Sequence, residues 1–258
     1  MSWVVATFNC NGIRARMPIL LDWLAAKSPD VVCLQETKVQ DKDFPAGPLE
    51  EAGYRAAYWG QKSYNGVAIL SRAEPEEVWR GFDDGGEEDQ ARLISARFGD
   101  RWVVNTYIPQ GREVGSEHFA YKLEFFARLG RWFEERLRPD REVLWCGDLN
   151  VAPADLDVHD PDKLRGHVCF HPDEQAALAE VAGWGFSDLF RRYHPDKRQF
   201  TFWDYRVPNG FKRDIGWRID HIMVTAPLAE AGVDCWVDAE PRGLVKPSDH
   251  TFLMAEFV

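Results

Sequence analysis

The chain alternates short apolar runs with polar segments, and most of the runs are too short to be helices. β-branched and aromatic side chains dominate them, and Gly, Pro, Asn or Asp residues separate them. Strands are therefore predicted at residues 3–8, 30–35, 54–59, 66–71, 93–98, 102–107, 142–146, 219–225 and 252–257. These strands outnumber the helical patterns that lie between them.

Three longer segments show helical periodicity. Pro18 predicts the start of a helix that runs to about residue 27. Apolar residues three or four apart predict a helix over 118–137, ended by Arg138-Pro139. Another helix is predicted to follow His171-Pro172 and to end near Gly183. No Gly/Ser-rich linker divides the sequence, so we expect one layered α/β domain, residues 1–258, with two sheets and outer helices.

The overall charge limits how this chain could bind nucleic acid. It carries 31 Lys and Arg against 42 Asp and Glu, a net charge of −11. Proteins that coat nucleic acid with a general basic surface are excluded, because phosphate affinity grows with the number of cations. An enzyme with a small phosphate site is not excluded. Residues 74–89 hold eight acidic side chains and Arg80, and we interpret them as an exposed loop in preference to a cation site.

The distribution of apolar residues and cysteines indicates where in the cell the protein is expected. Residues 1–12 lack the pattern of a signal peptide, and no window approaches about 18 uninterrupted apolar residues, so we expect no membrane segment. The five cysteines are odd in number, widely spaced and without a CxxC pair. We therefore expect buried thiols in a reducing cytoplasm, with neither a disulfide framework nor a zinc site.

Polar residues that could carry chemistry recur where the predicted strands end. Taken singly, each has a structural explanation as a turn cap, a backbone partner or a buried imidazole. Together they fall where sites on α/β sheets are built. Carboxylates that converge there repel one another unless a cation lies among them, and oxygen ligands favour Mg²⁺ or Mn²⁺ over zinc. The residues are Asn9, Asn11, Glu36, Tyr107, Asp148, Asn150, Asp220, Asp249 and His250.

The segments around these residues resemble the exonuclease III family of apurinic/apyrimidinic endonucleases, within the DNase I-like superfamily. They occur in family order as FNCNGIRAR (8–16), LQETK (34–38), NTYIPQG (105–111), GDLNVAP (147–153), FTFWDYR (200–206), GWRID (216–220) and PSDHTF (247–252). The resemblance implies a four-layer αββα sandwich of two packed mixed sheets flanked by helices. It also implies a Mg²⁺-dependent DNA repair nuclease that hydrolyses the phosphodiester 5′ to an abasic site in duplex DNA. Activity as a 3′→5′ exonuclease and as a 3′-phosphatase or phosphodiesterase is expected beside it.

The resemblance assigns a role to each polar residue at the strand ends. It makes Glu36 the principal metal-binding residue, with Asn11 and Asp249 on the metal side and Mn²⁺ as an alternative ion. Asp148 would deprotonate the attacking water and Asn9 would align Asp148. Asn150 and Tyr107 would contact the phosphate, while His250, oriented by Asp220, would face a phosphate oxygen. The identity of the general base and the number of metal ions stay open.

The resemblance also identifies residues that would contact DNA. Phe202, Trp217 and Ile219 match a pocket for a flipped-out abasic deoxyribose, although Phe202 and Trp217 are also explained as core aromatics. Backbone contacts are expected from Arg112, Lys122, Lys212 and Arg213, each of which could instead be merely solvated. The expected partner is double-stranded DNA with abasic sites or 3′ ends, bound by a monomer. The acidic run must then point away from the DNA.

Two other functions are alternatives to the predicted DNA repair nuclease. A non-enzymatic relative would have lost part of the site, whereas Glu36, Asp148, Asn150, Asp220 and His250 are all present. A phosphatase or phospholipase of the superfamily would share only the GDLN and SDH segments. The loop 111–122, GREVGSEHFAYK, departs from the family pattern, so the balance between endonuclease and exonuclease action stays open.

Overall fold

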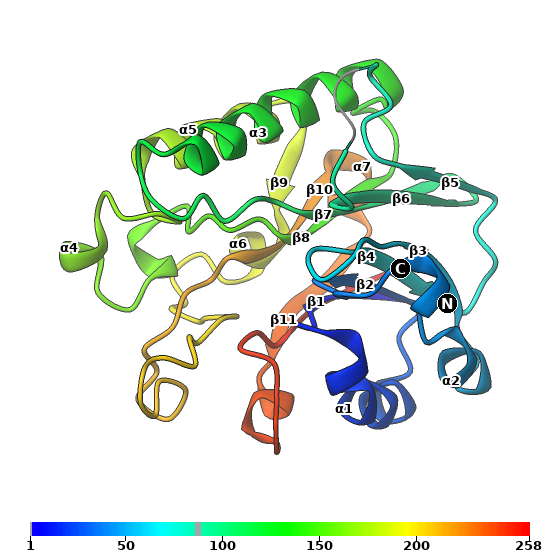
Figure 1. Cartoon of the computed structure of the whole chain (residues 1–258). Helices are drawn as coiled ribbons and strands as arrows, with labels where there is room; N and C mark the ends of the chain where they lie inside the picture. Colours follow the sequence, from blue (N-terminus) through cyan, green and yellow to red (C-terminus); the bar gives the residue numbers. More distant parts are fainter. Residues whose placement is uncertain (1, 86–88) are drawn as a thin grey trace.

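The computed structural model describes residues 2–85 and 89–258, and two β-sheets packed face to face form its centre (Figure 1). The first sheet has the strand order β11-β12-β1-β2-β4-β3. Only β1 and β2 run parallel, and the other neighbours pair antiparallel, so the sheet is mixed. Its strands are β1 (Trp3–Asn9), β2 (Val31–Gln35), β3 (Arg55–Trp59), β4 (Val67–Ser71), β11 (Gly232–Asp238) and β12 (Phe252–Phe257).

The second sheet repeats this arrangement with the order β5-β6-β7-β8-β10-β9. Here β7 and β8 form the parallel pair, and the remaining neighbours are antiparallel. Its strands are β5 (Glu77–Arg80), β6 (Leu93–Phe98), β7 (Arg101–Tyr107), β8 (Val143–Asp148), β9 (Phe186–Asp188) and β10 (Asp220–Thr225).

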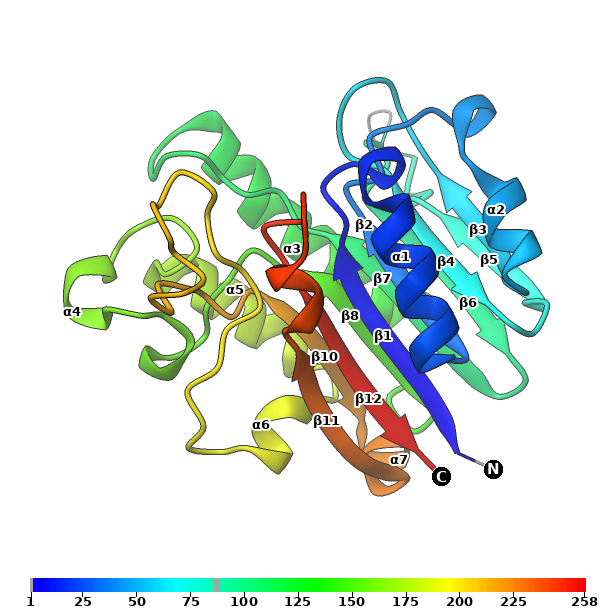
Figure 2. The same cartoon turned by 90° about the horizontal axis from the view of Figure 1, so that it is seen from below.

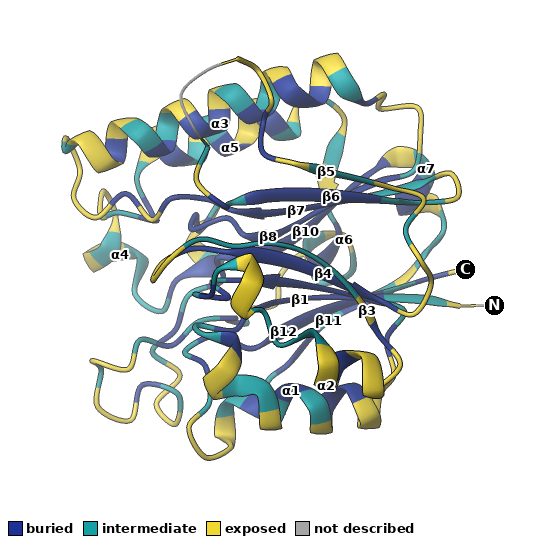
Figure 3. Cartoon of the chain, turned by 45° about the vertical axis from the view of Figure 1, so that its right-hand side comes forward, coloured by how far each residue is buried: buried dark blue, intermediate teal, exposed yellow. Residues whose placement is uncertain are grey.

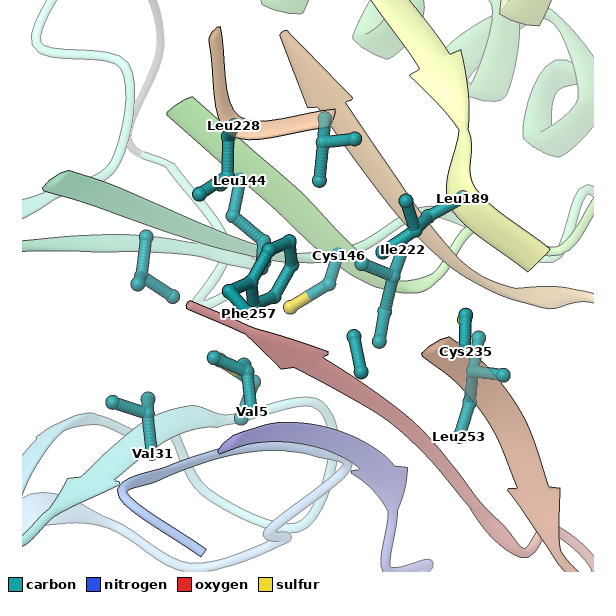
Figure 4. Close-up of a cluster of buried hydrophobic side chains, with 14 of the residues drawn as sticks. Val5, Val31, Leu144, Cys146, Leu189, Ile222, Leu228, Cys235, Leu253 and Phe257 are labelled. Carbon is teal, nitrogen blue, oxygen red and sulfur yellow. The ribbon is translucent and has the colours of Figure 1, made fainter. Parts of the chain in front are cut away.

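The space between the sheets is filled by apolar side chains (Figure 4). Val5 of β1 and Val31 of β2 point into it from the first sheet, and Leu144 and Cys146 of β8 point into it from the second. The alternate residues, such as Phe8, pack on the outer face against helices. Central strands are therefore buried on both faces, which is why they read as continuous apolar runs in the sequence.

Helices cover the outer face of each sheet. Helices α1 (Ile13–Lys27) and α2 (Ala46–Glu51) lie on the first sheet, and Figure 2 shows α1 along it. Helices α3 (Glu117–Arg136) and α5 (Pro172–Ala182) lie on the second. Burial is concentrated in the strands and exposure on the outer helix faces (Figure 3). The predicted αββα sandwich is confirmed.

Shorter elements connect these layers. They are α4 (Pro161–Leu164), α6 (Leu189–Tyr193), α7 (Ala226–Glu230) and the 3₁₀ turns at Asp41–Asp43, Asp155–Asp157 and Glu240–Gly243.

The first helix begins earlier than predicted. Pro18 lies inside α1, which starts at Ile13. The reason is tertiary, because the backbone N–H groups of Gly12 and Ile13 donate to the carbonyls of Glu36 (2.7 Å) and Thr37 (3.1 Å). These bonds fix the chain at the end of β1 and start the helix immediately after it. The helices at 117–136 and 172–182 lie where the periodicity predicts them.

The interpretation of 74–89 as one exposed loop is wrong in part. Residues Glu77–Arg80 form the edge strand β5, and its Trp79 packs beneath α3. Arg128 of α3 then binds Asp84 and Asp89, both at 2.8 Å. Glu87 and Glu88 of the acidic run lie outside the described residues. Strands β9 and β11 were also not predicted.

The structure also bears on membrane-spanning helices and on the state of the cysteines. Within residues 2–85 and 89–258, no helix is long and apolar enough to cross a membrane. The cysteines were expected to be buried thiols, and all five are buried and free in the described chain.

The topology brings distant segments to one edge of the sandwich. Strands β1, β2, β7 and β8 all end there, while β10 and β12 begin there. In consequence, the polar residues next to six different strand ends converge on a single edge.

Candidate active site

Asp148 and Asp220 face each other across the β8–β10 ladder, where they are register partners. Asp148 is only 2% exposed. Asn9 Nδ2 donates to its Oδ2 at 2.8 Å, and the backbone N–H of Asn150 donates to its Oδ1 at 3.0 Å. Burial raises the pKa of Asp148 to about 7, with the nearby negative charge of Asp220 adding to the rise. The carboxylate is thus held in place and titrates near neutral pH.

His250 lies beside these two carboxylates. Its Nδ1 donates to Asp220 Oδ2 at 2.8 Å, and its Nε2 is 3.7 Å from Asp148 Oδ2. Burial alone would lower the pKa of His250, but the charges of Asp220 and Asp148 outweigh it and raise the pKa to about 10. The imidazole is therefore protonated at neutral pH. Phe202 packs on it with ring centroids 4.8 Å apart.

A second polar group forms around Glu36, directly after β2. The Tyr107 hydroxyl donates a short hydrogen bond to Glu36 Oε1. Burial, together with the charges of Glu36 and Asp148, raises the pKa of Tyr107 well above its ordinary value. Tyr107 is the register partner of Asp148 across the parallel β7–β8 pair, so this strand pair links the two polar groups.

The predicted metal residues form a cluster of oxygen atoms that attracts positive charge. Asn11 Nδ2 donates to Asp249 Oδ1 at 2.9 Å. The ammonium of Lys38 lies 2.5 Å from Asn11 Oδ1 and 3.4 Å from Glu36 Oε2. Two carboxylates and an amide oxygen are ligands suited to a hard divalent cation. The donor atoms of these side chains are therefore of the kind that fits a divalent metal ion.

A different trio brings potential metal ligands closest together among the described residues. Ligand atoms of Asp148, Asp220 and His250 all lie within 4.8 Å of one another. Within this trio, His250 Nδ1 already donates to Asp220 Oδ2 at 2.8 Å. The structure thus holds a hydrogen-bonded carboxylate–imidazole trio and, beside it, the oxygen cluster around Glu36.

Asn150 is fixed by its own backbone and side chain. It adopts a left-handed conformation with φ 51°, just after β8. Its Nδ2 donates to the carbonyl of Ile108 at 2.9 Å, and its backbone N–H is bound by Asp148. Asn9, in turn, accepts at Oδ1 from the backbone N–H of Asn11 at 3.0 Å. Both amides are held within the same network as Asp148.

A cavity of about 630 Å³ joins these groups to an apolar wall. Its polar lining includes Asn9, Glu36, Tyr107, Asp148, Asn150, Asp249 and His250. The three predicted pocket residues, Phe202, Trp217 and Ile219, line the same cavity. Phe202 is bridged by backbone pairing to both Trp217 and His250. The cavity therefore has an apolar wall beside its charged centre.

The basic residues expected to contact DNA divide into two groups. Arg112, Lys212 and Arg213 are exposed, and Arg112 lines the cavity. Lys122 is fully buried and pairs with buried Glu174 at 2.5 Å. The expectation that Lys122 touches the DNA backbone is therefore wrong, because its ammonium is enclosed between α3 and α5.

Two charged residues near the site were not assigned by the sequence reasoning. Lys38 follows Glu36 by two residues, and that opposite charge beside a candidate ligand was an available signal. Arg218 lies between Trp217 and Ile219, is fully buried, and donates to Asp157 (2.6 Å) and Asp188 (2.7 Å). Nothing in its local sequence distinguishes this buried arginine from a solvated one.

Comparison with known sequences places the geometry in context. The pattern of the Endonuclease/Exonuclease/phosphatase family matches residues 6–250. The chain is 38% identical to exodeoxyribonuclease III of Haemophilus influenzae over 97% of its own length and 98% of that protein.

Solved structures give the same result. An AP endonuclease from Archaeoglobus fulgidus superposes with a TM-score of 0.96 at 45% identity, covering 99% of both chains. The 3′ phosphatase NExo from Neisseria, bound to a product DNA hairpin, superposes with a TM-score of 0.95 at 36% identity over 99% of both chains. The chain therefore belongs to the Endonuclease/Exonuclease/phosphatase family, in the exonuclease III branch of apurinic/apyrimidinic endonucleases, and is a hydrolytic nuclease.

Proposed function

We propose that this enzyme hydrolyses the phosphodiester 5′ to an abasic site in duplex DNA. We propose that it also acts at 3′ ends, as a 3′→5′ exonuclease and a 3′-phosphatase or phosphodiesterase. One observation carries the proposal: a single cavity unites the acid–base group, the oxygen cluster that attracts a cation, and the apolar wall. The relatives named as an exodeoxyribonuclease, an AP endonuclease and a 3′ phosphatase support it.

Mg²⁺ is the proposed cofactor, with Mn²⁺ as an alternative. Glu36, Asp249 and Asn11 would hold it, since all three supply oxygen ligands and Lys38 contacts two of them. A bound divalent cation neutralises charge on the phosphate and stabilises the leaving oxygen.

The acid–base group would carry the proton transfers. Asp148 is oriented by Asn9 and the backbone of Asn150, and as a carboxylate it can accept a proton from water. Protonated His250, held by Asp220, can donate a hydrogen bond to a phosphate oxygen as negative charge develops there. Asn150 and Tyr107 line the same cavity and can bind the remaining phosphate oxygens, the Tyr107 hydroxyl by turning from Glu36 to the phosphate.

The apolar wall supplies the selectivity for abasic sites. A deoxyribose without a base can pack against Phe202, Trp217 and Ile219. A nucleotide that keeps its base must place a larger polar group in the same space, and this favours the abasic sugar.

The proposed partner is double-stranded DNA with abasic sites or 3′ ends, bound by a monomer. A monomer suffices because one chain supplies the cavity lining together with Asn11 and Asp220, which bind Asp249 and His250. We also propose that residues 1–258 act as one catalytic domain in the cytoplasm. The family match over 6–250 supports the single catalytic domain. The free, buried cysteines of the described chain support the cytoplasmic location.

A duplex with a single tetrahydrofuran abasic analogue tests this function. With Mg²⁺, we expect one nick 5′ to the analogue that leaves a 3′-hydroxyl, and no nick with EDTA. Absence of a metal-dependent nick would exclude endonuclease action at abasic sites. The same incubation with nicked and 3′-phosphate duplexes measures the balance between the endonuclease and 3′-end activities.

A further inference from the structure

An ion pair without any solvent contact lies beneath two of the loops that line the active-site cavity. Lys122 of α3 and Glu174 of α5 are both fully buried, with Lys122 Nζ 2.5 Å from Glu174 Oε1. Removing two charges from water is costly, and an apolar pair of similar size is often as stable. Simple packing of α3 on α5 therefore does not require these charges.

The ammonium of Lys122 also binds the backbone of two loops that line the cavity. Its Nζ donates to the carbonyl of Asn150 at 2.6 Å and to the carbonyl of Gln110 at 3.3 Å. Asn150 follows β8 and Gln110 follows β7. One buried group thus connects the loops that continue from the strands of Asp148 and Tyr107.

The two loops also share an unusual backbone conformation. Asn150 (φ 51°) and Arg112 (φ 54°) both lie in the left-handed region, which asparagine adopts readily and arginine only where its surroundings hold it. Gly111, directly before Arg112, lies against the Lys122 side chain, since an added Cβ there would come within 3.3 Å of Lys122 Cδ. The Lys122 side chain therefore contacts the Asn150 backbone in one loop and the residues directly before Arg112 in the other.

Glu174 anchors Lys122 from the other side. Its Oε2 accepts from the backbone N–H of His171 at 3.2 Å, in a capping box at the start of α5. Both carboxylate oxygens of Glu174 are therefore engaged, one with the ammonium and one with the helix start. This arrangement fixes the ammonium relative to α5 as well as α3.

We propose that the Lys122–Glu174 pair is a positioning device for the active site. It sets the backbone of Asn150 and of the Gln110–Arg112 loop, and through them the Asn150 amide and the Arg112 side chain that face the substrate. Lys122 acts through these residues and does not touch DNA. The inference rests on the proposed function for its effect on catalysis, but its effect on loop position can be measured without any substrate.

The double substitution Lys122→Met/Glu174→Leu removes both charges while filling the space. Because no charge is left unpaired, we expect a folded protein, with a melting temperature lowered modestly because the carbonyls of Asn150 and Gln110 and the N–H of His171 lose these partners. We expect kcat on the abasic-analogue duplex to fall by about tenfold or more, with KM changed by less than about threefold. Arg131→Gln is the control, since Arg131 is an exposed residue of the same helix, and kcat should stay close to wild type. A folded double variant with wild-type kcat would overturn the proposal.

Cys169 provides a readout that requires neither catalytic activity nor a folded double variant. Its Sγ lies 3.7 Å from Gln110 Nε2 and 3.8 Å from Asn150 Oδ1, so its protection reports the position of both loops. In Lys122→Gln, we expect a thiol reagent to label Cys169 about tenfold faster, with the other four cysteines still protected. Equal protection of all five cysteines in this variant would contradict the proposal. Absence of abasic-site activity in the wild type would instead contradict the proposed function alone.

Discussion

The charge states of Asp148 and His250 decide the pH range in which the proposed chemistry can run. Asp148 must be ionised to accept a proton, and burial raises its pKa to about 7. His250 must stay protonated, and Asp220 and Asp148 raise its pKa to about 10 against the opposing effect of burial. The rate should therefore increase as the pH rises through about 7 and decrease as it rises through about 10.

Asp220→Asn tests which group causes the alkaline limb. Removing the carboxylate that binds His250 Nδ1 lowers the pKa of the imidazole, so the alkaline limb should move to lower pH. The measurement is a single-turnover pH profile at saturating metal for wild type and variant. An alkaline limb at the same pH in both proteins would show that His250 is not the group that titrates there.

Trp217→Ala tests whether the apolar side of the cavity selects abasic sugars. Removing the indole should widen the space beside Phe202 and Ile219, so intact nucleotides should enter more readily. The ratio of kcat/KM for the abasic analogue to that for an intact duplex should fall by about 10-fold to 100-fold. An unchanged ratio would leave Trp217 with a packing role only.

Single residues also show what the sequence could and could not predict. Motifs at strand ends predicted Asp148, His250 and Glu36 as site residues, and the structure brings all three to one cavity. Lys122 was misassigned because a lysine in an amphipathic helix looks solvated unless its acidic partner, 52 residues away, is known to pack against it. Burial of a charged pair is a tertiary property and leaves no local signal.

At the level of elements, the alignment of β7 with β8 sets the distance between Tyr107 and Asp148. Gly147 makes this possible, since its φ is 137° and an added Cβ would lie 1.9 Å from the carbonyl oxygen of Thr106. Gly147→Ala should therefore push the strands apart and destabilise the fold by about 2–4 kcal/mol. Thermal or urea unfolding measures this change.

Gly130→Ala in α3 is the matched control for that substitution. Its added Cβ would meet only Val181 Cγ2, at 3.8 Å, and alanine is the better helix former by about 1 kcal/mol. The control should unfold at the wild-type temperature or above it. Equal stability of the two variants would show that the close approach at Gly147 does not constrain the strand pair.

Elements with long, strictly periodic patterns were predictable, and short edge elements were not. The helix at 117–136 and the central strands were found because both depend on apolar periodicity. Strand β5 was missed because an edge strand with Glu77 and Arg80 exposed reads as a polar loop. The start of α1 was placed too late because hydrogen bonds to the loop after β2, and not Pro18, decide it.

On the scale of the whole molecule, the net charge of −11 must be reconciled with binding to DNA. Part of the acidic run is neutralised locally, since Arg128 binds Asp84 and Asp89 and Arg136 binds Asp83. These contacts lie along α3, whereas exposed Lys212 and Arg213 belong to the loop that leads into Trp217. The acidic and basic features are thus held by different parts of the fold.

Lys212→Gln/Arg213→Gln tests whether this loop contacts the DNA backbone. Each lost phosphate contact should reduce the slope of log K against log salt by about 0.9, so the double variant should bind more weakly and with less salt dependence. Arg138→Gln is the control, because exposed Arg138 precedes β8 and so lies at the edge opposite the site. Equal slopes for the double variant and the wild type would remove these residues from the DNA interface.

The whole fold was predictable from motifs in family order, and the chain's agreement with AP endonuclease structures confirms it. What the sequence could not supply was the set of contacts between segments far apart in the chain, such as Lys38 with Asn11 or Arg218 with Asp157. Those contacts arise only when a folded sheet brings the ends of neighbouring strands together, β1 with β2 and β8 with β10.

The single-turnover rate of Asp148→Asn on the abasic-analogue duplex tests the central claim most directly. The amide keeps the shape of Asp148 but cannot take a proton from water, so the rate should fall by about a thousandfold or more while DNA affinity is retained. Binding and thermal unfolding, measured in parallel, separate loss of chemistry from loss of fold. A folded variant that binds the duplex and cuts it at a rate within about tenfold of wild type would contradict the assignment of this cavity as the catalytic site.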